Sequence, residues 1–148
     1  MKIESLSDEA RQAAFEAMVA MAWADAHLTR EEVFAVRAAG ELLTLDADVL
    51  DALDAGPPDL SSLPIEGLEW ADRRLVYLCA AWMAVVDGRE DDVEGALLAE
   101  LRERLDVPHE EAATLREDAR MMHVTAPSSM PWYEELAAVI SAAASRRP

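Results

Sequence analysis

Apolar residues recur every three or four positions along most of this chain, a spacing that predicts helices. The first apolar face includes Phe15 and Trp23, and it follows Ser7, a residue type that caps helix N-termini well. A second face begins after Thr29 and Glu32, which have the spacing of a capping box. Alanine and leucine are abundant while strand-forming residues are scarce, so we expect an all-helical protein.

The same pattern predicts further helices along the rest of the chain. A short third helix follows Asp46 and stops at Gly56, where a proline-punctuated linker begins. The fourth, from about Glu66 to Val86, is apolar on nearly all sides and should form the buried centre of a bundle. The fifth, sixth and seventh are expected at about 91–105, from Pro108 onward, and at about 129–145.

The two halves of the chain repeat each other when the sequence is shifted by 62 positions. Matching pairs keep their order, and they are Phe15 with Tyr77, Met21 with Met83, Asp25 with Asp87, Glu32 with Glu94, and Leu43 with Leu105. We therefore predict a single domain at 1–148, with repeats at about 7–56 and 67–119 and a C-terminal helix at about 129–145. The fold would be a compact all-α bundle of about seven helices, formed by two copies of a three-helix unit plus that last helix.

Each copy ends its long apolar helix at an aspartate, Asp25 or Asp87, and further acidic residues follow. Unpaired carbonyl groups at a helix C-terminus repel an anion, so such a carboxylate either meets a cation or turns forward to cap the next helix. Carboxylates and carbonyls form the all-oxygen ligand set that Ca²⁺, Mg²⁺ or Mn²⁺ prefers. The candidate metal ligands are Asp25 and Glu32 in the first turn, and Asp87, Glu90, Asp91 and Glu94 in the second.

Capping is the alternative role for these acidic residues. Glu32 has a capping-box partner in Thr29, whereas Glu94 lies three residues after another carboxylate, Asp91, and is less easily explained in this way. If the two copies pack about a pseudo-twofold axis, the two turns could face each other and pool their carboxylates. Both roles stay open at this point.

The acidic turns also carry a family resemblance. Asp87-Gly88 with a glutamate seven residues after the aspartate, repeated at Asp25, and apolar pairs about a dozen positions later resemble the tellurite-resistance TerB-like family, over about Ala14 to Asp118. The first copy departs from the pattern, because Ala26 stands where the family has glycine. The resemblance implies an internally duplicated helical domain that binds divalent metal at these turns. It also implies a stress-response role near the cytoplasmic membrane.

The charge of the chain limits its partners. Thirteen basic against thirty acidic residues give a net charge of −17, which opposes binding to nucleic acid and to anionic lipid. The same charge permits cations or basic partners, or it serves solubility alone. The longest apolar run, from Leu75 to Val86, is too short to span a membrane, and the N-terminus does not read as a signal peptide. We expect a cytoplasmic protein without direct membrane insertion.

Residues for catalysis are few. Cys79 lies in the most apolar helix, where a buried and inert thiol is expected, and His27, His109 and His123 lack metal-ligand spacing on one helix. No glycine-rich phosphate loop or nucleophile elbow is present. We predict no enzyme and no catalytic residues, but a metal-binding scaffold or sensor with protein partners, membrane-associated stress proteins among them. The alternative is a metal-free helical protein-interaction domain.

Overall fold

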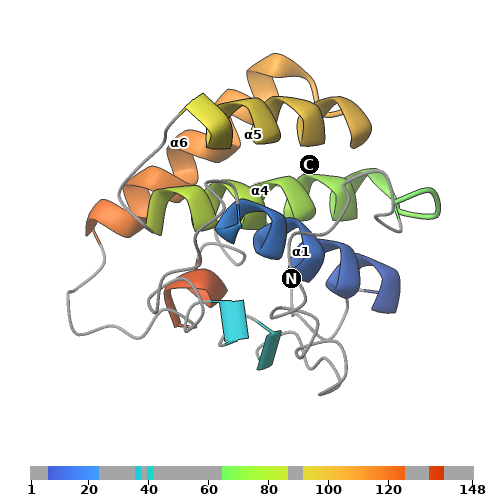
Figure 1. The fold of residues 1–148 in the computed structure, drawn as a ribbon, viewed down its shortest axis with the longest axis horizontal. Helices are drawn as coiled ribbons and strands as arrows, with labels where there is room; N and C mark the ends of the chain where they lie inside the picture. The colour runs from blue at the N-terminus through green and yellow to red at the C-terminus, as the bar shows by residue number, and fades with distance from the viewer. Residues whose placement is uncertain are drawn as a thin grey trace.

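The computed structural model describes residues 7–23, 36–37, 40–41, 65–86, 92–125 and 134–138 (Figure 1). Four long helices occur in these ranges: α1 (Asp8–Ala22), α4 (Trp70–Val86), α5 (Asp92–Arg104) and α6 (His109–Thr125). Residues 36–37, 40–41 and 134–138 are helical as well, and the described part of the chain contains no strand. The predicted all-α class is confirmed for this part. The predicted third helix and most of the linker lie outside it, so the count of seven helices and the duplication stay predictions.

The start of α1 follows the predicted cap. The Ser7 hydroxyl accepts a hydrogen bond from the backbone N–H of Ala10 at 3.1 Å, and Asp8 and Glu9 place negative charge in the first turn. Both features stabilise a helix N-terminus, because they satisfy a free N–H group and complement the helix dipole. The helix ends at Ala22, and the N–H of Trp23 bonds the carbonyl of Val19.

The predicted start of the fourth helix at Glu66 is wrong, because α4 begins at Trp70. The N–H of Leu68 bonds the carbonyl of Ile65 at 3.1 Å, which makes a turn before the helix. Arg73 secures this turn, since its guanidinium donates to the carbonyls of Ile65 and Leu68, at 3.2 Å each. A side chain from the first turn of α4 therefore satisfies carbonyl groups that a longer helix would have used.

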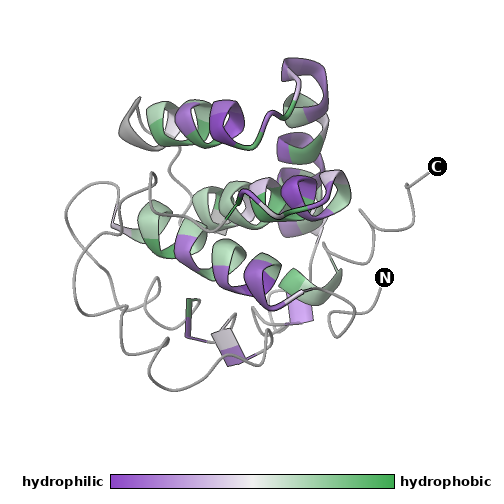
Figure 2. Cartoon of the chain, turned by 90° about the vertical axis from the view of Figure 1, so that its right-hand side faces the viewer, coloured by the Kyte–Doolittle hydropathy of each residue, from purple (hydrophilic) through white to green (hydrophobic). Residues whose placement is uncertain are grey.

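α4 lies between α1 on one side and the α5–α6 pair on the other (Figure 1). Every residue from Leu75 to Ala84 is buried, which agrees with the predicted central helix. Figure 2 colours the helices by hydropathy and shows hydrophilic and hydrophobic residues alternating along them, as in helices with one buried face. The largest fully buried side chains are Trp82, Tyr77, Phe15, Met18, Leu78, Met83, Leu101, Leu105 and Leu136. Among the described helices, none has the length and apolar character needed to cross a membrane.

A tight turn joins α5 to α6. Asp106 has φ 57°, in the left-handed region, and its N–H bonds the carbonyl of Glu103, while the N–H of Val107 bonds the carbonyl of Arg102. This pair of bonds is the Schellman ending of a helix, and aspartate is one of the few residues other than glycine that tolerate the conformation. α6 then starts directly after Pro108, as predicted.

Candidate functional site

Most of the predicted metal ligands lie outside the described residues. This holds for Asp25, Glu32, Asp87, Glu90 and Asp91. Glu94 belongs to α5, but its side chain also lies outside the description. The metal site therefore stays a prediction, and the described part of the chain informs it only through the helices next to it.

These neighbouring helices have two features in common. α4 starts 62 residues after α1, at Trp70 and Asp8, and this is also the spacing of Asp87 and Asp25. The two helices pack against each other and run in the same general direction in Figure 1, so their C-terminal ends lie on the same side of the bundle. Asp25 follows the last residue of α1 by three positions, and Asp87 follows Val86 directly.

The last turns of the four long helices differ in charge. α5 ends with Arg102 and Arg104, and α6 has His123 in its last turn, whereas neither α1 nor α4 has a basic residue there. A cation at a helix C-terminus offsets the partial negative charge of the free carbonyl groups. The two central helices therefore end without the compensating charge that α5 and α6 supply for themselves.

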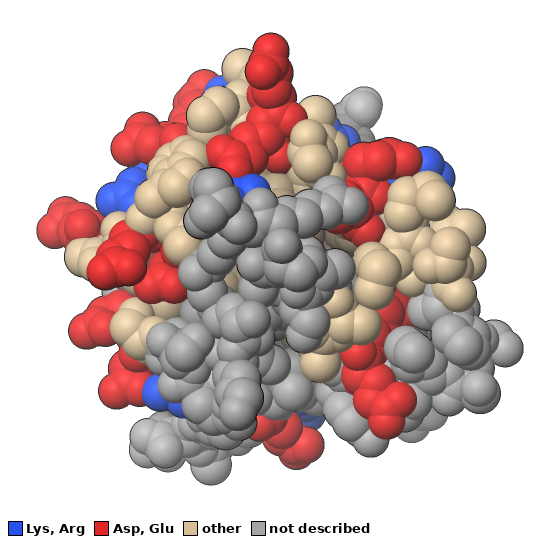
Figure 3. Space-filling view, turned by 180° about the vertical axis from the view of Figure 1, so that it is seen from behind, with Lys and Arg blue, Asp and Glu red and all other residues tan. Residues whose placement is uncertain are grey.

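Negative charge is spread widely over the described surface. Figure 3 shows carboxylates scattered over the face that it views, with few basic groups between them. Within the described ranges, no group of three or more histidine, cysteine, aspartate or glutamate side chains is close enough to hold a metal ion.

A buried polar cluster joins three helical segments. Oε2 of Glu135 accepts a hydrogen bond from the indole Nε1–H of Trp82 on α4 at 2.7 Å, and it lies 2.8 Å from Nδ1 of His123 on α6. Glu135 is only 4% exposed and belongs to the helical residues 134–138. A buried carboxyl group is costly unless polar partners satisfy it, and these two contacts with Oε2 supply such partners. The cluster therefore attaches this segment to α4 and α6.

This cluster was not predicted from the sequence. Trp82 and Glu135 are separated by 53 positions, and no spacing rule connects them. A histidine oriented by a carboxylate occurs in catalytic sites, where the other ring nitrogen transfers a proton. In the described part of the chain, the contacts of Glu135 with His123 and Trp82 tie residues 134–138 to α6 and α4.

The single thiol is buried, as predicted. Cys79 lies among the buried residues of α4, and burial raises the pKa of its thiol to about 12. A thiol with such a pKa stays protonated at neutral pH, so it is a poor nucleophile and a poor metal ligand. His109, at the start of α6, is exposed.

Comparison with known proteins finds no family model, no curated protein and no solved structure that matches this chain. The resemblance to the TerB-like family therefore depends on the motif residues alone.

Proposed function

We propose that this chain is a non-enzymatic, TerB-like scaffold or sensor that binds a divalent cation at the acidic turns after α1 and α4. The observation that carries the proposal is what the C-terminal ends of α1 and α4 have in common. Both end without a basic residue in the last turn, both point the same way, and an aspartate follows each in the sequence. A bound cation would supply the positive charge that these ends lack.

The chemistry of the turns favours a hard cation. The six candidate ligands are all carboxylates, and free carbonyl groups at the helix ends add more oxygen. Ca²⁺, Mg²⁺ and Mn²⁺ prefer such ligands, whereas Zn²⁺ usually takes histidine or cysteine. The net charge of −17 also attracts cations from a distance. In a cytoplasmic stress system, occupancy of these turns would change the surface offered to a protein partner.

Calorimetric titration of the chelator-treated chain with Ca²⁺, Mg²⁺ and Mn²⁺ tests the proposal. We expect saturable binding of at least one ion and a rise in melting temperature, because a ligand that binds only the folded state stabilises it. Replacing Asp25 and Asp87 together by asparagine should abolish this binding. The absence of both heat and a melting shift at about millimolar metal would end the metal proposal.

A matched variant separates specific binding from general attraction by charge. The double variant Glu66→Gln with Glu69→Gln also removes two negative charges, but from exposed positions before α4. This variant should bind metal as the unchanged protein does. Equal losses of metal affinity in the two double variants would mean that metal ions bind the acidic surface without a defined site.

A second candidate is a metal-free helical interaction domain. It is favoured by the exposed apolar residues at the end of α6, where Met121 is 46% and Val124 is 64% exposed. Under this alternative, the change of Asp25 and Asp87 to asparagine would stabilise the metal-free protein, because unfavourable charge at two helix ends is removed. Under the metal proposal, the defining effect of the same variant is the loss of metal affinity.

A further inference from the structure

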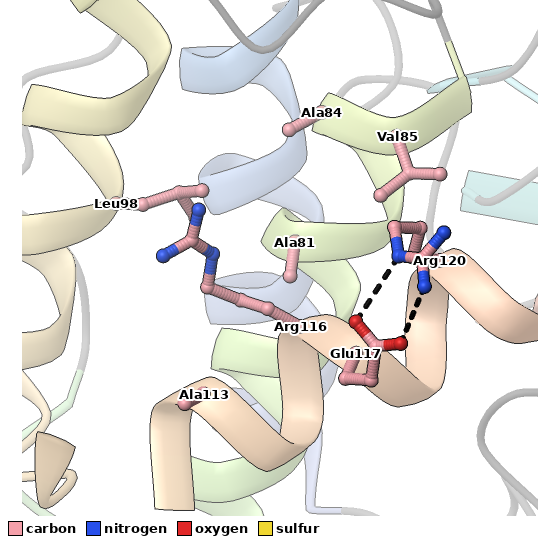
Figure 4. Close-up of a pocket in the computed structure, with 8 residues that line it drawn as sticks. All are labelled: Ala81, Ala84, Val85, Leu98, Ala113, Arg116, Glu117 and Arg120. Carbon is pink, nitrogen blue, oxygen red and sulfur yellow. Dashed lines mark hydrogen bonds and ion pairs between the residues drawn. The ribbon is translucent and has the colours of Figure 1, made fainter. Parts of the chain in front are cut away.

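A small pocket opens between α4, α5 and α6. Its volume is about 200 Å³. Five apolar residues from the three helices line it, and they are Ala81, Ala84 and Val85 of α4, Leu98 of α5 and Ala113 of α6 (Figure 4). Three of the five are alanines, so the side chains that meet here are too small to fill the space between the helices. None of the candidate metal ligands is among the residues that line it.

The base of this pocket is apolar and buried. Ala81, Ala84 and Leu98 are each at most 3% exposed, whereas Ala113 is exposed and lies at the mouth. A water molecule inside a protein needs two to four polar partners, and the side chains of alanine and leucine offer none. An apolar ligand would displace such poorly bonded water and bury its own surface at the same time. Both effects favour binding.

The rim carries charged residues, and two of them are paired with each other. Arg116, Glu117 and Arg120, all from α6, complete the lining. Glu117 accepts two hydrogen bonds from Arg120, at 3.0 Å from Nε and 2.5 Å from Nη2, and these bonds lower the pKa of its carboxyl group (Figure 4). A charged ligand would have to compete with this pair, whereas a neutral ligand leaves it intact.

The volume of the pocket sets the size of the ligand. An apolar cavity of about 150 Å³ holds a benzene molecule, so the space here admits one six-membered ring with a short substituent. The buried side chains at the base offer no hydrogen-bonding group. Apolar character and shape therefore decide which ring enters, and an ionised group on it would lose water without a gain at the base.

We propose that this pocket binds small, neutral, apolar compounds of one ring, aromatic or alicyclic, with the ring against Ala81, Ala84 and Leu98. A bound ring would fill the space between α4, α5 and α6 and so stabilise the packing of these three helices. Neither the acidic turns nor a metal ion takes part in this binding. The proposal thus goes beyond the cation proposal, and each can fail without the other.

Titration of the full chain with benzene, followed by backbone amide shifts in NMR spectra, tests the proposal. We expect saturable shifts that centre on Ala81, Leu98 and Ala113, with a Kd on the order of millimolar, since a ligand of this size gains only a few kcal/mol. Cyclohexane should bind within about threefold of benzene, because the two rings bury similar apolar surface. Benzoate should bind no more tightly than benzene, because its carboxylate gains nothing from the apolar base.

A pair of variants locates the binding. Ala113→Met places a long side chain at the mouth of the pocket and should weaken benzene at least about tenfold. The position is exposed and methionine is a good helix former, so the fold should tolerate the change. Ala99→Met is the matched control, because it makes the same change at an exposed position of α5 outside the pocket lining. It should bind benzene as the unchanged chain does.

A third variant tests the pocket from the opposite direction. Val85→Ala removes two methyl groups from the lining and enlarges the space. The affinity for para-xylene relative to benzene should therefore rise at least about threefold, the value of one buried methyl group. If Ala113→Met unfolds the chain, this ratio decides the matter alone.

Several results would overturn the proposal. One is the absence of saturable shifts with benzene at about ten times the expected Kd. A second is tighter binding of benzoate than of benzene, which would mean that charge at the rim selects the ligand. A third is an equal loss of benzene affinity in Ala113→Met and Ala99→Met, and a fourth is an unchanged ratio of para-xylene to benzene affinity in Val85→Ala.

Discussion

α1 and α4 pack against each other and have a similar pattern of buried positions, although most of their aligned residues differ in identity. When α4 is aligned on α1 with the spacing of 62, the buried stretch from Ala13 to Ala22 falls on the buried stretch from Leu75 to Ala84. One position in this stretch breaks the match. Glu16 of α1 is half-buried, whereas its counterpart Leu78 in α4 is fully buried.

The difference shows that the same spacing of apolar positions occurs in two helices that are buried to different extents. α4 buries all ten residues of the stretch, whereas α1 leaves one position partly open. The half-buried position in α1 satisfies the carboxylate of Glu16 only in part. Oε2 of Glu16 is buried and has no hydrogen-bond partner among the described residues, and burial raises the pKa of the Glu16 carboxyl group above its ordinary value. Changes at matched positions of the two helices therefore test how far they are equivalent.

The largest effect is expected when α4 receives the residue of α1. Leu78→Glu puts a charge at a fully buried position, so it should destabilise the fold by more than about 4 kcal/mol. Leu78→Ala leaves only a cavity and should cost about 3 kcal/mol. Urea unfolding followed by far-UV circular dichroism measures both. A Leu78→Glu protein that unfolds close to the unchanged chain would show that α4 is less central than the burial indicates.

A smaller loss is expected at Trp82, whose counterpart in α1 is Ala20. Trp82→Phe keeps most of the buried volume but removes the donor to Glu135, so it should cost about 1–3 kcal/mol. Trp70→Phe is the matched control, because Trp70 is 45% exposed, and it should cost less than about 0.5 kcal/mol. Equal losses in the two variants would mean that the Trp82–Glu135 hydrogen bond contributes nothing.

Periodicity predicted the parts of these helices that depend on local sequence. The continuous apolar run of α4 was found in this way, and the cap at Ser7 was found from its residue type. The start of α4 was placed four residues too early, because the bonds from Arg73 to carbonyls before the helix leave no periodic signal. A hydrogen bond between residues 53 positions apart, such as the one from Trp82 to Glu135, is also beyond any spacing rule.

The functional predictions depended on a different kind of information. The acidic turns were chosen by motif and charge, and the residues that carry them lie outside the described ranges, so their geometry is untested. The pocket between α4, α5 and α6, lined by Ala81, Leu98 and Ala113 among others, had no signal in the sequence, because alanines are common in any helix (Figure 4). Only packing shows that they meet and leave a space beneath two arginines.

A gain in stability is expected when α1 loses its half-buried charge. Burial raises the pKa of Glu16 in the folded state, against a smaller opposing effect of its hydrogen bond with Gln12. Folding is therefore favoured below the ordinary pKa of 4.5, and this contribution is lost as the pH rises through the folded-state value. Glu16→Gln should raise stability at about pH 7 by less than about 1 kcal/mol, and the gain should vanish below about pH 4.

Thermal unfolding of this variant across that pH range measures the gain. Glu9→Gln, at an exposed position of the same helix, is the control and should give no gain. A gain from Glu16→Gln that is the same at both ends of the range would show that the amide packs better, and that charge burial is not the cause.

The smallest effect is expected at Tyr77, which stands where α1 has Phe15. Tyr77 is 2% exposed, and burial raises the pKa of its phenol above 10, although the charges of Arg116 and Arg102 lower it in part. Tyr77→Phe should change stability by less than about 1 kcal/mol at neutral pH. Above about pH 10 the unchanged protein should lose more stability than the variant. The reason is that the phenol of Tyr77 ionises more readily in the unfolded chain than in the folded protein, so rising pH favours unfolding. Parallel unfolding curves for the two proteins over that range would mean that the phenol of Tyr77 reaches solvent and that the aromatic positions of α1 and α4 differ in more than one hydroxyl group.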